Sequence, residues 1–157
     1  MEKTYHAMDV ANWFIDKFDK DVGDVITYLK LQKLLYYAEA WTQLLLNRTL
    51  FEEQFEAWAH GPVVREVFHE FKDAKWSPLE IQGNLIKFDE DVQNVLTQVL
   101  KAYGGVPAKT LENMTHNERP WIEARGGCAP EQRCTEAIHK ASIKNYFQDK
   151  YGAKLNA

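Results

Sequence analysis

Apolar residues recur at three- and four-residue steps along most of the chain, the spacing that places them on one face of an α-helix. Met8, Ala11, Phe14 and Phe18 show this spacing first, with polar residues between them. Prolines and glycines interrupt the pattern where helices are expected to begin or end. The pattern predicts helices at about residues 7–20, 27–47, from Gly61-Pro62 to 71, 89–103, after Pro107, from Pro120, and at 140–151.

The predicted helix at residues 27–47 is the longest and the most apolar. Thr27 is a suitable N-cap, because its hydroxyl can accept a hydrogen bond from a free backbone N–H of the first turn. Leu31, Leu34 and Leu35 share one face of this helix, and further apolar residues widen that face. A helix that is apolar on several sides is expected at the centre of a bundle, with more than one neighbour packed against it.

Two segments between the helices have a weaker pattern. Residues 50–59 are aromatic and partly alternating, so they form either an extended strand or an irregular loop. Residues 75–87 have the composition of a loop, although Ile81 and Leu85 leave room for a short strand. The predicted fold class is therefore mostly α: a compact single-domain bundle of about six helices around the central apolar helix, with room for one short β-strand pair.

Length and composition limit the class of protein. A chain of 157 residues fits one domain, which we expect to span residues 1–157, with a core at about 8–150 and a tail at 152–157. A hydrophobic content of 45%, with 13% aromatic residues, is enough to form a core. The formal charge of −4, from 19 basic and 23 acidic side chains, argues against non-specific nucleic-acid binding but leaves a local basic patch open.

The location of the protein is inferred from what its sequence lacks. Its two cysteines, Cys128 and Cys134, are too few for a secreted disulfide scaffold in a chain of this length. The N-terminus has no basic-then-apolar signal segment, and no apolar stretch approaches the ~20 residues that span a bilayer. We therefore expect a cytoplasmic protein with reduced thiols, and neither a membrane nor a nucleic acid as its partner.

No pattern in the sequence indicates catalytic, cofactor-binding or metal-binding residues. The two serines are not in a nucleophile elbow, and five residues separate the cysteines, where paired zinc ligands usually have two to four between them. His116, Asn117 and Arg119 invite comparison with a nuclease, but we favour a turn that connects two helices. An enzyme remains an alternative, and it predicts a cleft of converging titratable groups with shifted pKa values.

Four polar residues, in the predicted central helix and beside Gly61-Pro62, each have a structural or a functional interpretation. His60 either covers Trp58 from a turn, which we favour, or lies beside a helix N-terminus where an anion docks. Lys30 and Lys33 either cover apolar surface with their stems while their amines reach water, or form a basic strip for an acidic partner. Gln32 is expected to be a buried amide that fixes a backbone turn.

Several short motifs occur in an order and at a spacing that resemble the Panacea domain family, also described as SocA-like or phage-associated GepA-like. The resemblance covers nearly the whole chain, from about Val10 to Phe147. Each motif alone is weak, whereas the five in order are specific. The motifs are residues 27–37, Leu50-Phe51 with Glu56-Ala57-Trp58 and Gly61-Pro62-Val63, Thr115-His116, Pro120-Trp121, and Ile138, Ile143 and Tyr146-Phe147.

The resemblance implies an antitoxin, which is not an enzyme. Members of the family are typically encoded beside a toxin in bacteria and phages, and they neutralise that toxin by direct protein–protein contact. One alternative is a proteolytic adaptor that delivers a toxin or another client to a bacterial unfoldase–protease. Another is a phage-associated binding protein with a target that is not a toxin. The family has no established catalytic residues, so none is transferred to this chain.

Large aromatic and arginine side chains are the usual anchors of protein interfaces. We therefore expect partner contacts from such residues in or beside the family motifs, with His60 added because of its place before Gly61. The five candidate partner-binding residues are Tyr37, Trp58, His60, Arg65 and Arg119.

Overall fold

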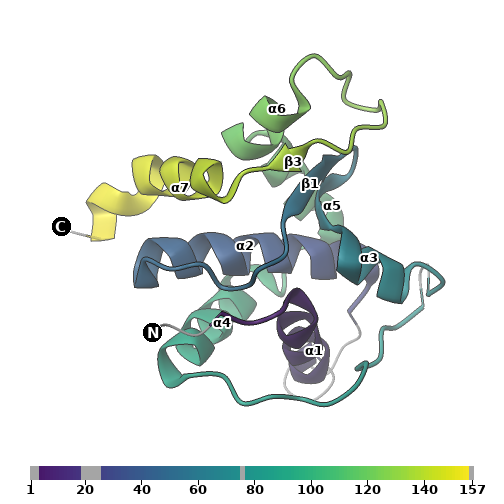
Figure 1. The fold of residues 1–157 in the computed structure, drawn as a ribbon, viewed down its shortest axis with the longest axis vertical. Coiled ribbons are helices and arrows are strands. Elements are labelled where there is room, and N and C mark those ends of the chain that lie inside the picture. Colours follow the sequence, from purple (N-terminus) through teal and green to yellow (C-terminus); the bar gives the residue numbers. More distant parts are fainter. Residues whose placement is uncertain (1–3, 19–25, 75–76, 156–157) are drawn as a thin grey trace.

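A computed structural model of the chain describes residues 4–18, 26–74 and 77–155. Within these ranges the chain forms seven helices and three short strands (Figure 1). The mostly α fold class is confirmed. In chain order the elements are α1 (Ala7–Lys17), α2 (Tyr28–Leu46), β1 (Phe55–Trp58), β2 (Gly61–Val64), α3 (Arg65–Phe71), α4 (Glu90–Tyr103), α5 (Ala108–His116), α6 (Arg119–Arg125), β3 (Ala137–Ile138) and α7 (Lys140–Leu155).

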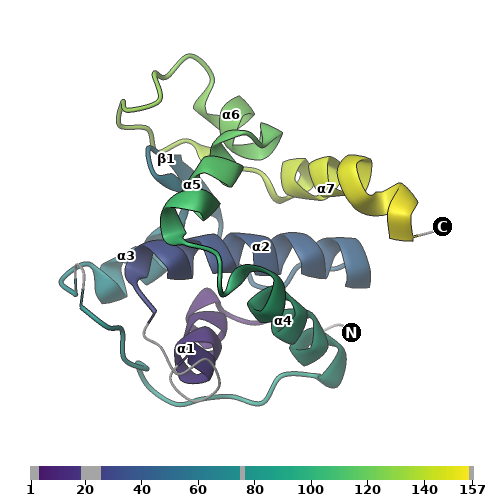
Figure 2. The ribbon, with the colours of Figure 1, turned by 180° about the vertical axis from the view of Figure 1, so that it is seen from behind.

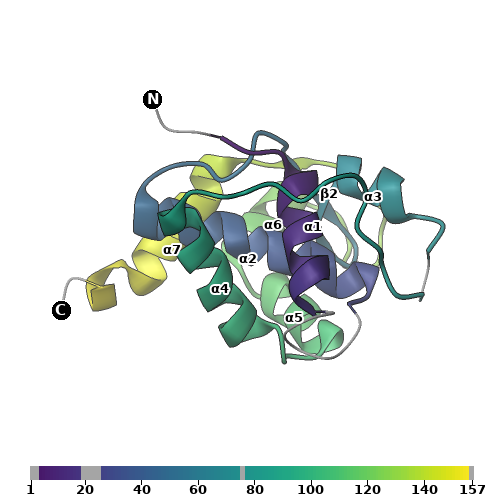
Figure 3. The same ribbon diagram turned by 90° about the horizontal axis from the view of Figure 1, so that it is seen from below.

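Helix α2 is the centre of the fold, as its apolar surface predicts. Helices α1 and α4 cross one side of it, while α7 and the sheet lie on the other side (Figures 1 and 3). Seen from behind, α5 lies against α2 and also contacts β2 (Figure 2). The helix begins after Thr27 and ends before Asn47, whose φ of 54° stops it in the left-handed region.

An aromatic cluster joins α2 to the last helix. Tyr36 and Tyr37 are buried on α2, and the ring of Phe147 from α7 meets both at centroid distances of 6.1 and 6.2 Å. Phe55 of β1 packs edge-on against Tyr36 at 5.8 Å. The core therefore links the sheet, the central helix and the C-terminal helix into one body.

Strands β1 and β2 form an antiparallel hairpin, and β3 pairs with the other edge of β1. The hairpin contradicts the prediction that a helix begins at Gly61-Pro62, because that helix, α3, begins at Arg65. Gly61 has a φ of 114°, which closes the turn after Ala59-His60 and which glycine adopts without steric cost. Pro62 lies on the edge strand, where its missing N–H costs little.

The free edge of β2 is held by a side chain and not by another strand. The amide of Gln32 accepts a hydrogen bond from the N–H of Val64 at 2.9 Å and donates one to its carbonyl at 3.2 Å. Gln32 is fully buried. Its predicted burial is confirmed, but the backbone that its amide binds belongs to Val64 of strand β2 and not to a turn. Gln32 therefore couples α2 to the end of the hairpin.

Other boundaries differ from the sequence-based expectation. Residues 77–89, which the structure describes, contain no strand, and Leu85 and Ile86 are exposed there. Thr115 and His116 belong to α5 and not to a turn. Helix α7 continues to Leu155, past its predicted end at Tyr151. The end predicted for the first helix, near residue 20, lies outside the described residues.

Candidate functional site: the pocket beside the β1–β2 hairpin

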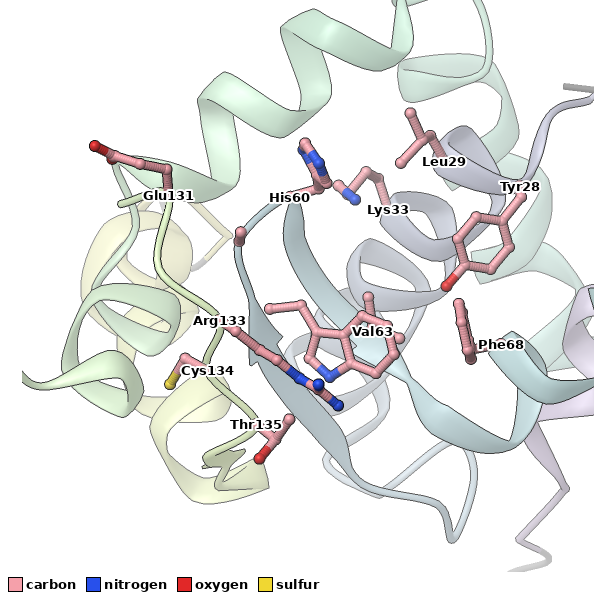
Figure 4. A pocket seen from close by; sticks show the side chains of 12 residues that line it. Tyr28, Leu29, Lys33, His60, Val63, Phe68, Glu131, Arg133, Cys134 and Thr135 are labelled. Carbon is pink, nitrogen blue, oxygen red and sulfur yellow. The ribbon is translucent and has the colours of Figure 1, made fainter. Parts of the chain in front are cut away.

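A pocket of about 500 Å³ opens beside the hairpin (Figure 4). Tyr28 at the start of α2 and Phe68 of α3 form one wall, and Trp58 and Val63 come from the hairpin itself. Four residues of the segment before β3 line the opposite side: Glu131, Arg133, Cys134 and Thr135. Two of the five motifs described above therefore meet at the pocket: residues 27–37, which include the start of α2, and the motif that contains the hairpin.

Lys33 brings a buried charge to this pocket. Its side chain is only 1% exposed, and its Nζ has no hydrogen-bond partner among the described residues. Figure 4 shows Lys33 among the residues that line the pocket. Burial lowers the pKa of Lys33 to about 8, and the charge of Glu112 acts in the opposite direction. The protonated form therefore still predominates at neutral pH, without a hydrogen-bonded counter-ion in the described structure.

Gly61 allows the hairpin to lie directly on Lys33. A methyl group placed at Gly61 would be 2.7 Å from Cε of Lys33 and 2.9 Å from Oγ1 of Thr115, both closer than carbon contacts allow. Glycine adopts the positive φ without strain, and its missing Cβ leaves room for the Lys33 side chain. The end of the lysine stem therefore lies against the turn and beside Thr115 of α5.

Glu112 of α5 carries the carboxylate whose charge acts on Lys33. Its Oε1 lies 2.7 Å from Nδ1 of His60, and its Oε2 accepts a hydrogen bond from Lys109. Burial alone would raise the pKa of Glu112, but the hydrogen bonds from Lys109 and His60 outweigh it and the pKa is lowered. Glu112 therefore remains charged, with each of its oxygens already bound by a residue other than Lys33.

Two of the five candidate residues, Trp58 and His60, line the pocket, and a third, Arg65, is linked to Trp58 through a shared carboxylate. Trp58 is half-buried against Phe68, and His60 is exposed at the tip of the hairpin. The indole N–H of Trp58 and the guanidinium of Arg65 both donate to Oε1 of Glu56, at 2.8 and 2.9 Å. The shared carboxylate holds Trp58 and Arg65 together. His60 is in a hairpin turn, so the alternative that placed it beside a helix N-terminus is wrong.

The other two candidates lie elsewhere. Tyr37 is 1% exposed, stacks on Tyr103 at 4.2 Å and donates a hydrogen bond to Glu118, so it is a core residue and not a surface contact. Arg119 is exposed, but it pairs with Asp149 at 2.7 Å and lies over Tyr146, between α6 and α7. It belongs to a surface separate from the pocket lining.

Lys33 fits neither of the interpretations considered for it, because its amine reaches neither water nor an exposed basic strip. Its neighbour Lys30 donates to the backbone carbonyl of Gly104 at 2.9 Å. The sequence did offer an indication, since Lys33 lies among Leu31, Leu34 and Leu35 in a helix that is buried on most sides. A charge within such a run is expected to be either paired or functional.

Two buried carboxylates that the sequence did not reveal stabilise the scaffold behind the pocket. Glu118 accepts hydrogen bonds from the hydroxyls of Tyr36 and Tyr37 at 2.8 and 2.9 Å. Burial raises the pKa of Glu118, and these hydrogen bonds act in the opposite direction. Glu39 is fully buried and binds Lys140 of α7 at 2.6 Å. Both groups fix the position of α2 relative to the C-terminal half of the chain.

The residues that the structure describes lack both metal-binding clusters and membrane-spanning helices. Those residues contain no group of three or more His, Cys, Asp or Glu side chains placed to hold a metal ion. Both cysteines are free thiols, as expected. Among the described helices, none combines the length and the apolar character needed to cross a membrane.

Comparison with known proteins assigns the family. The family model described as "Antitoxin SocA-like, Panacea domain" matches residues 31–122, which is more than half of the chain and includes most of α2 and the whole hairpin. Searches of curated proteins and of solved structures found no match. The chain therefore belongs to the family of SocA-like antitoxins with a Panacea domain, and its role is of the antitoxin type.

Proposed function

We propose that this protein is an antitoxin that binds a cognate protein toxin and neutralises it by direct contact. The observation that carries the proposal is the family match over residues 31–122. The partner would be the protein encoded beside this chain in a bacterial or phage genome, and the contact would form in the cytoplasm. Neutralisation would occur by covering the active site or a moving element of the toxin, without turnover.

The surface around the pocket is the contact face that the geometry supports best. Trp58 offers a half-buried aromatic side chain, and His60 and Arg65 flank it with exposed polar groups. A half-buried aromatic beside an apolar depression is the arrangement from which interface anchors are usually built. Arg119 remains a candidate for a second contact region between α6 and α7. Tyr37 is no longer a candidate, because it is buried.

Co-expression with the protein encoded by the adjacent gene tests the proposal. We expect that protein alone to arrest bacterial growth and this chain to restore growth, with the two proteins copurifying as a complex. Growth arrest that persists in the presence of this chain would contradict the proposal. An empty vector and a destabilised Gly61→Ala variant serve as controls.

The amount of toxin distinguishes occlusion from delivery to a protease. If this chain occludes the toxin, growth recovers while the half-life of the toxin stays the same or increases. If this chain is an adaptor for an unfoldase–protease, the half-life falls, and the rescue depends on that protease. Pulse-chase measurements in wild-type and protease-deficient cells therefore decide between the two mechanisms.

A further inference from the structure

We propose that Lys33 binds a carboxylate of the partner protein, and that the apolar pocket beside it receives an aliphatic or aromatic side chain adjacent to that carboxylate. This inference rests on the proposed function, since it specifies the chemistry by which the toxin is held. It commits to an acidic–apolar segment of a protein as the occupant of the pocket.

The ammonium group of Lys33 has no hydrogen-bond acceptor among the described residues. A buried ammonium group without a partner has lost its hydration and gained no hydrogen bond in return, which destabilises the free protein. Lys33 is 1% exposed, lacks a described hydrogen-bond partner and lines the pocket. An incoming carboxylate would supply the missing acceptor in a surrounding where charge-assisted hydrogen bonds are strong. Binding would therefore remove a cost that the free protein carries.

The charged groups around Lys33 favour an occupant with a single negative charge. Glu112 is close enough to Lys33 to raise its pKa, and Glu131 lines the pocket on the opposite side. A carboxylate carries one negative charge and so matches the single positive charge of Lys33, whereas a phosphate with two negative charges would leave an excess negative charge beside Glu112. Arg133 also lines the pocket and adds a second cation near its mouth. The balance of these charges favours a singly charged anion.

The volume and the aromatic lining of the pocket favour an apolar side chain beside the carboxylate. Tyr28, Trp58 and Phe68 surround the space with aromatic rings, and the volume of about 500 Å³ falls within the usual range for a specific binding pocket. A carboxylate by itself would leave most of this apolar surface exposed to water. A neighbouring apolar side chain of the same partner would cover it, which combines an orienting charge with a hydrophobic anchor.

Two small probes that differ only in charge test the site on the full chain. N-acetyl-L-phenylalanine carries a carboxylate beside an aromatic ring, and N-acetyl-L-phenylalaninamide is its neutral counterpart. Binding is followed by NMR of the lysine Cε and Nζ signals, with Lys33 assigned by comparison with the Lys33→Met variant. We expect the acid to bind at least about tenfold more tightly than the amide, a difference that corresponds to about 1.4 kcal/mol. We also expect the acid to move the titration of Lys33 to higher pH.

The Lys33→Met variant supplies the second part of the test. It keeps the length of the stem and removes the charge, so we expect it to fold with a melting temperature no lower than that of the wild type. The preference for the acid should disappear, and the affinity for the adjacent-gene toxin should fall at least about tenfold. Lys101→Met, which removes an exposed lysine on α4, is the matched control and should leave that affinity unchanged.

Three results would overturn the inference. The acid and the amide could bind equally well or not at all, inorganic phosphate could bind more tightly than the acid, or Lys33→Met could bind the toxin as tightly as the wild type. Tighter phosphate binding would assign the pocket to a free phosphorylated ligand. A Lys33→Met variant that still binds and neutralises the toxin would leave the antitoxin function intact and remove only the role of Lys33. Failure of the wild-type chain to neutralise the toxin would instead count against the proposed function.

Discussion

The side-chain amide of Gln32 forms two hydrogen bonds with the backbone of Val64, through its oxygen and through its nitrogen. In this way a helix side chain takes the place of a neighbouring strand at the edge of β2. The interaction fixes the height of the hairpin above α2, and with it the distance between Trp58 and the start of that helix. The pocket depends on this distance, because its walls come from both elements.

Gln32→Met should destabilise the fold. The replacement preserves the length of the side chain but leaves the buried N–H and carbonyl of Val64 without partners, which we expect to lower the free energy of unfolding by about 2–4 kcal/mol. Urea denaturation measures the change. Gln93→Met on the exposed surface of α4 is the control, with an expected change below about 0.5 kcal/mol. Equal effects of the two substitutions would show that the Gln32 hydrogen bonds contribute nothing specific.

Gly61→Ala should destabilise the hairpin for two reasons. Its φ of 114° is strained for any residue with a Cβ, and the new methyl group would meet Lys33 and Thr115. Together we expect a loss of about 1–3 kcal/mol in the free energy of unfolding. Gly105→Ala is the matched control, since nothing lies within 4 Å of its Cβ position. If thermal denaturation shows the same melting temperature for both variants, the close approach of Gly61 to Lys33 is not a constraint.

Stability should rise at alkaline pH because of Lys33. Its pKa is about 8 in the folded chain against a usual value of 10.5, so above pH 8 the unfolded chain binds more protons at this residue than the folded chain does. The free energy of unfolding therefore increases between these two pH values, by up to about 3 kcal/mol. Below pH 8 the lysine is charged in both states, and the cost of burying its charge is present in full.

Denaturation of the wild type and of Lys33→Met at pH 7, 8, 9 and 10 isolates this contribution. Other groups titrate in both proteins, so their effects cancel when the two curves are subtracted. The wild type should gain stability relative to the variant as the pH rises. Parallel curves would mean that the ammonium group has the pKa of an ordinary lysine.

Glu118→Ala should weaken the core behind the pocket. The substitution removes the acceptor for the hydroxyls of both Tyr36 and Tyr37, which are buried and would remain without partners. We expect a loss of about 2–4 kcal/mol in the free energy of unfolding. Glu123→Ala, which removes an exposed glutamate of α6, the helix that begins directly after Glu118, should change it by less than about 0.5 kcal/mol. A comparable loss with both variants in urea denaturation would point to helix α6 itself and not to the tyrosine hydroxyls.

Alanine variants of Trp58 and Arg119 should locate the contact face on the toxin. Truncating a half-buried aromatic anchor usually costs 1 kcal/mol or more, so we expect Trp58→Ala to weaken binding of the adjacent-gene toxin by about tenfold. Arg119 lies between α6 and α7, and its substitution should have a smaller effect if the contact is confined to the pocket surface. Calorimetric titration of the purified pair gives both affinities. The reverse order would move the contact face to α6 and α7.

The central helix was predictable because its information is local. Thr27 and Asn47 mark its ends, and the apolar repeat between them is continuous, so neighbouring residues alone specify it. The hairpin was not predictable in the same way. Gly61-Pro62 suits a helix start as well as a strand, and pairing with β1 and the hydrogen bonds from Gln32 decide the outcome. These contacts involve residues far apart in the sequence, which local patterns do not encode.

The candidate site was predicted in part for the same reason. Trp58 and His60 lie in the hairpin and Arg65 directly follows it at the start of α3, so closeness in the sequence brings these three residues near one another. Tyr37 was misplaced because α2 is apolar on several sides, and nothing local distinguishes a buried tyrosine from an exposed one on such a helix. Lys33 gains its importance only from the turn that closes above it and from Glu112 of α5.

The pairing of β3 with β1 limits where the chain can be cut to make a stable fragment. The family match ends at residue 122, whereas β3 pairs Ile138 with Phe55 and α7 brings Phe147 against Tyr36 and Tyr37. A fragment cut at that boundary would present β1 as a bare edge beside a broad hydrophobic surface, a combination prone to intermolecular strand pairing and precipitation. We therefore expect the segment matched by the family model not to fold by itself, and an expression fragment of this protein should extend through the last helix.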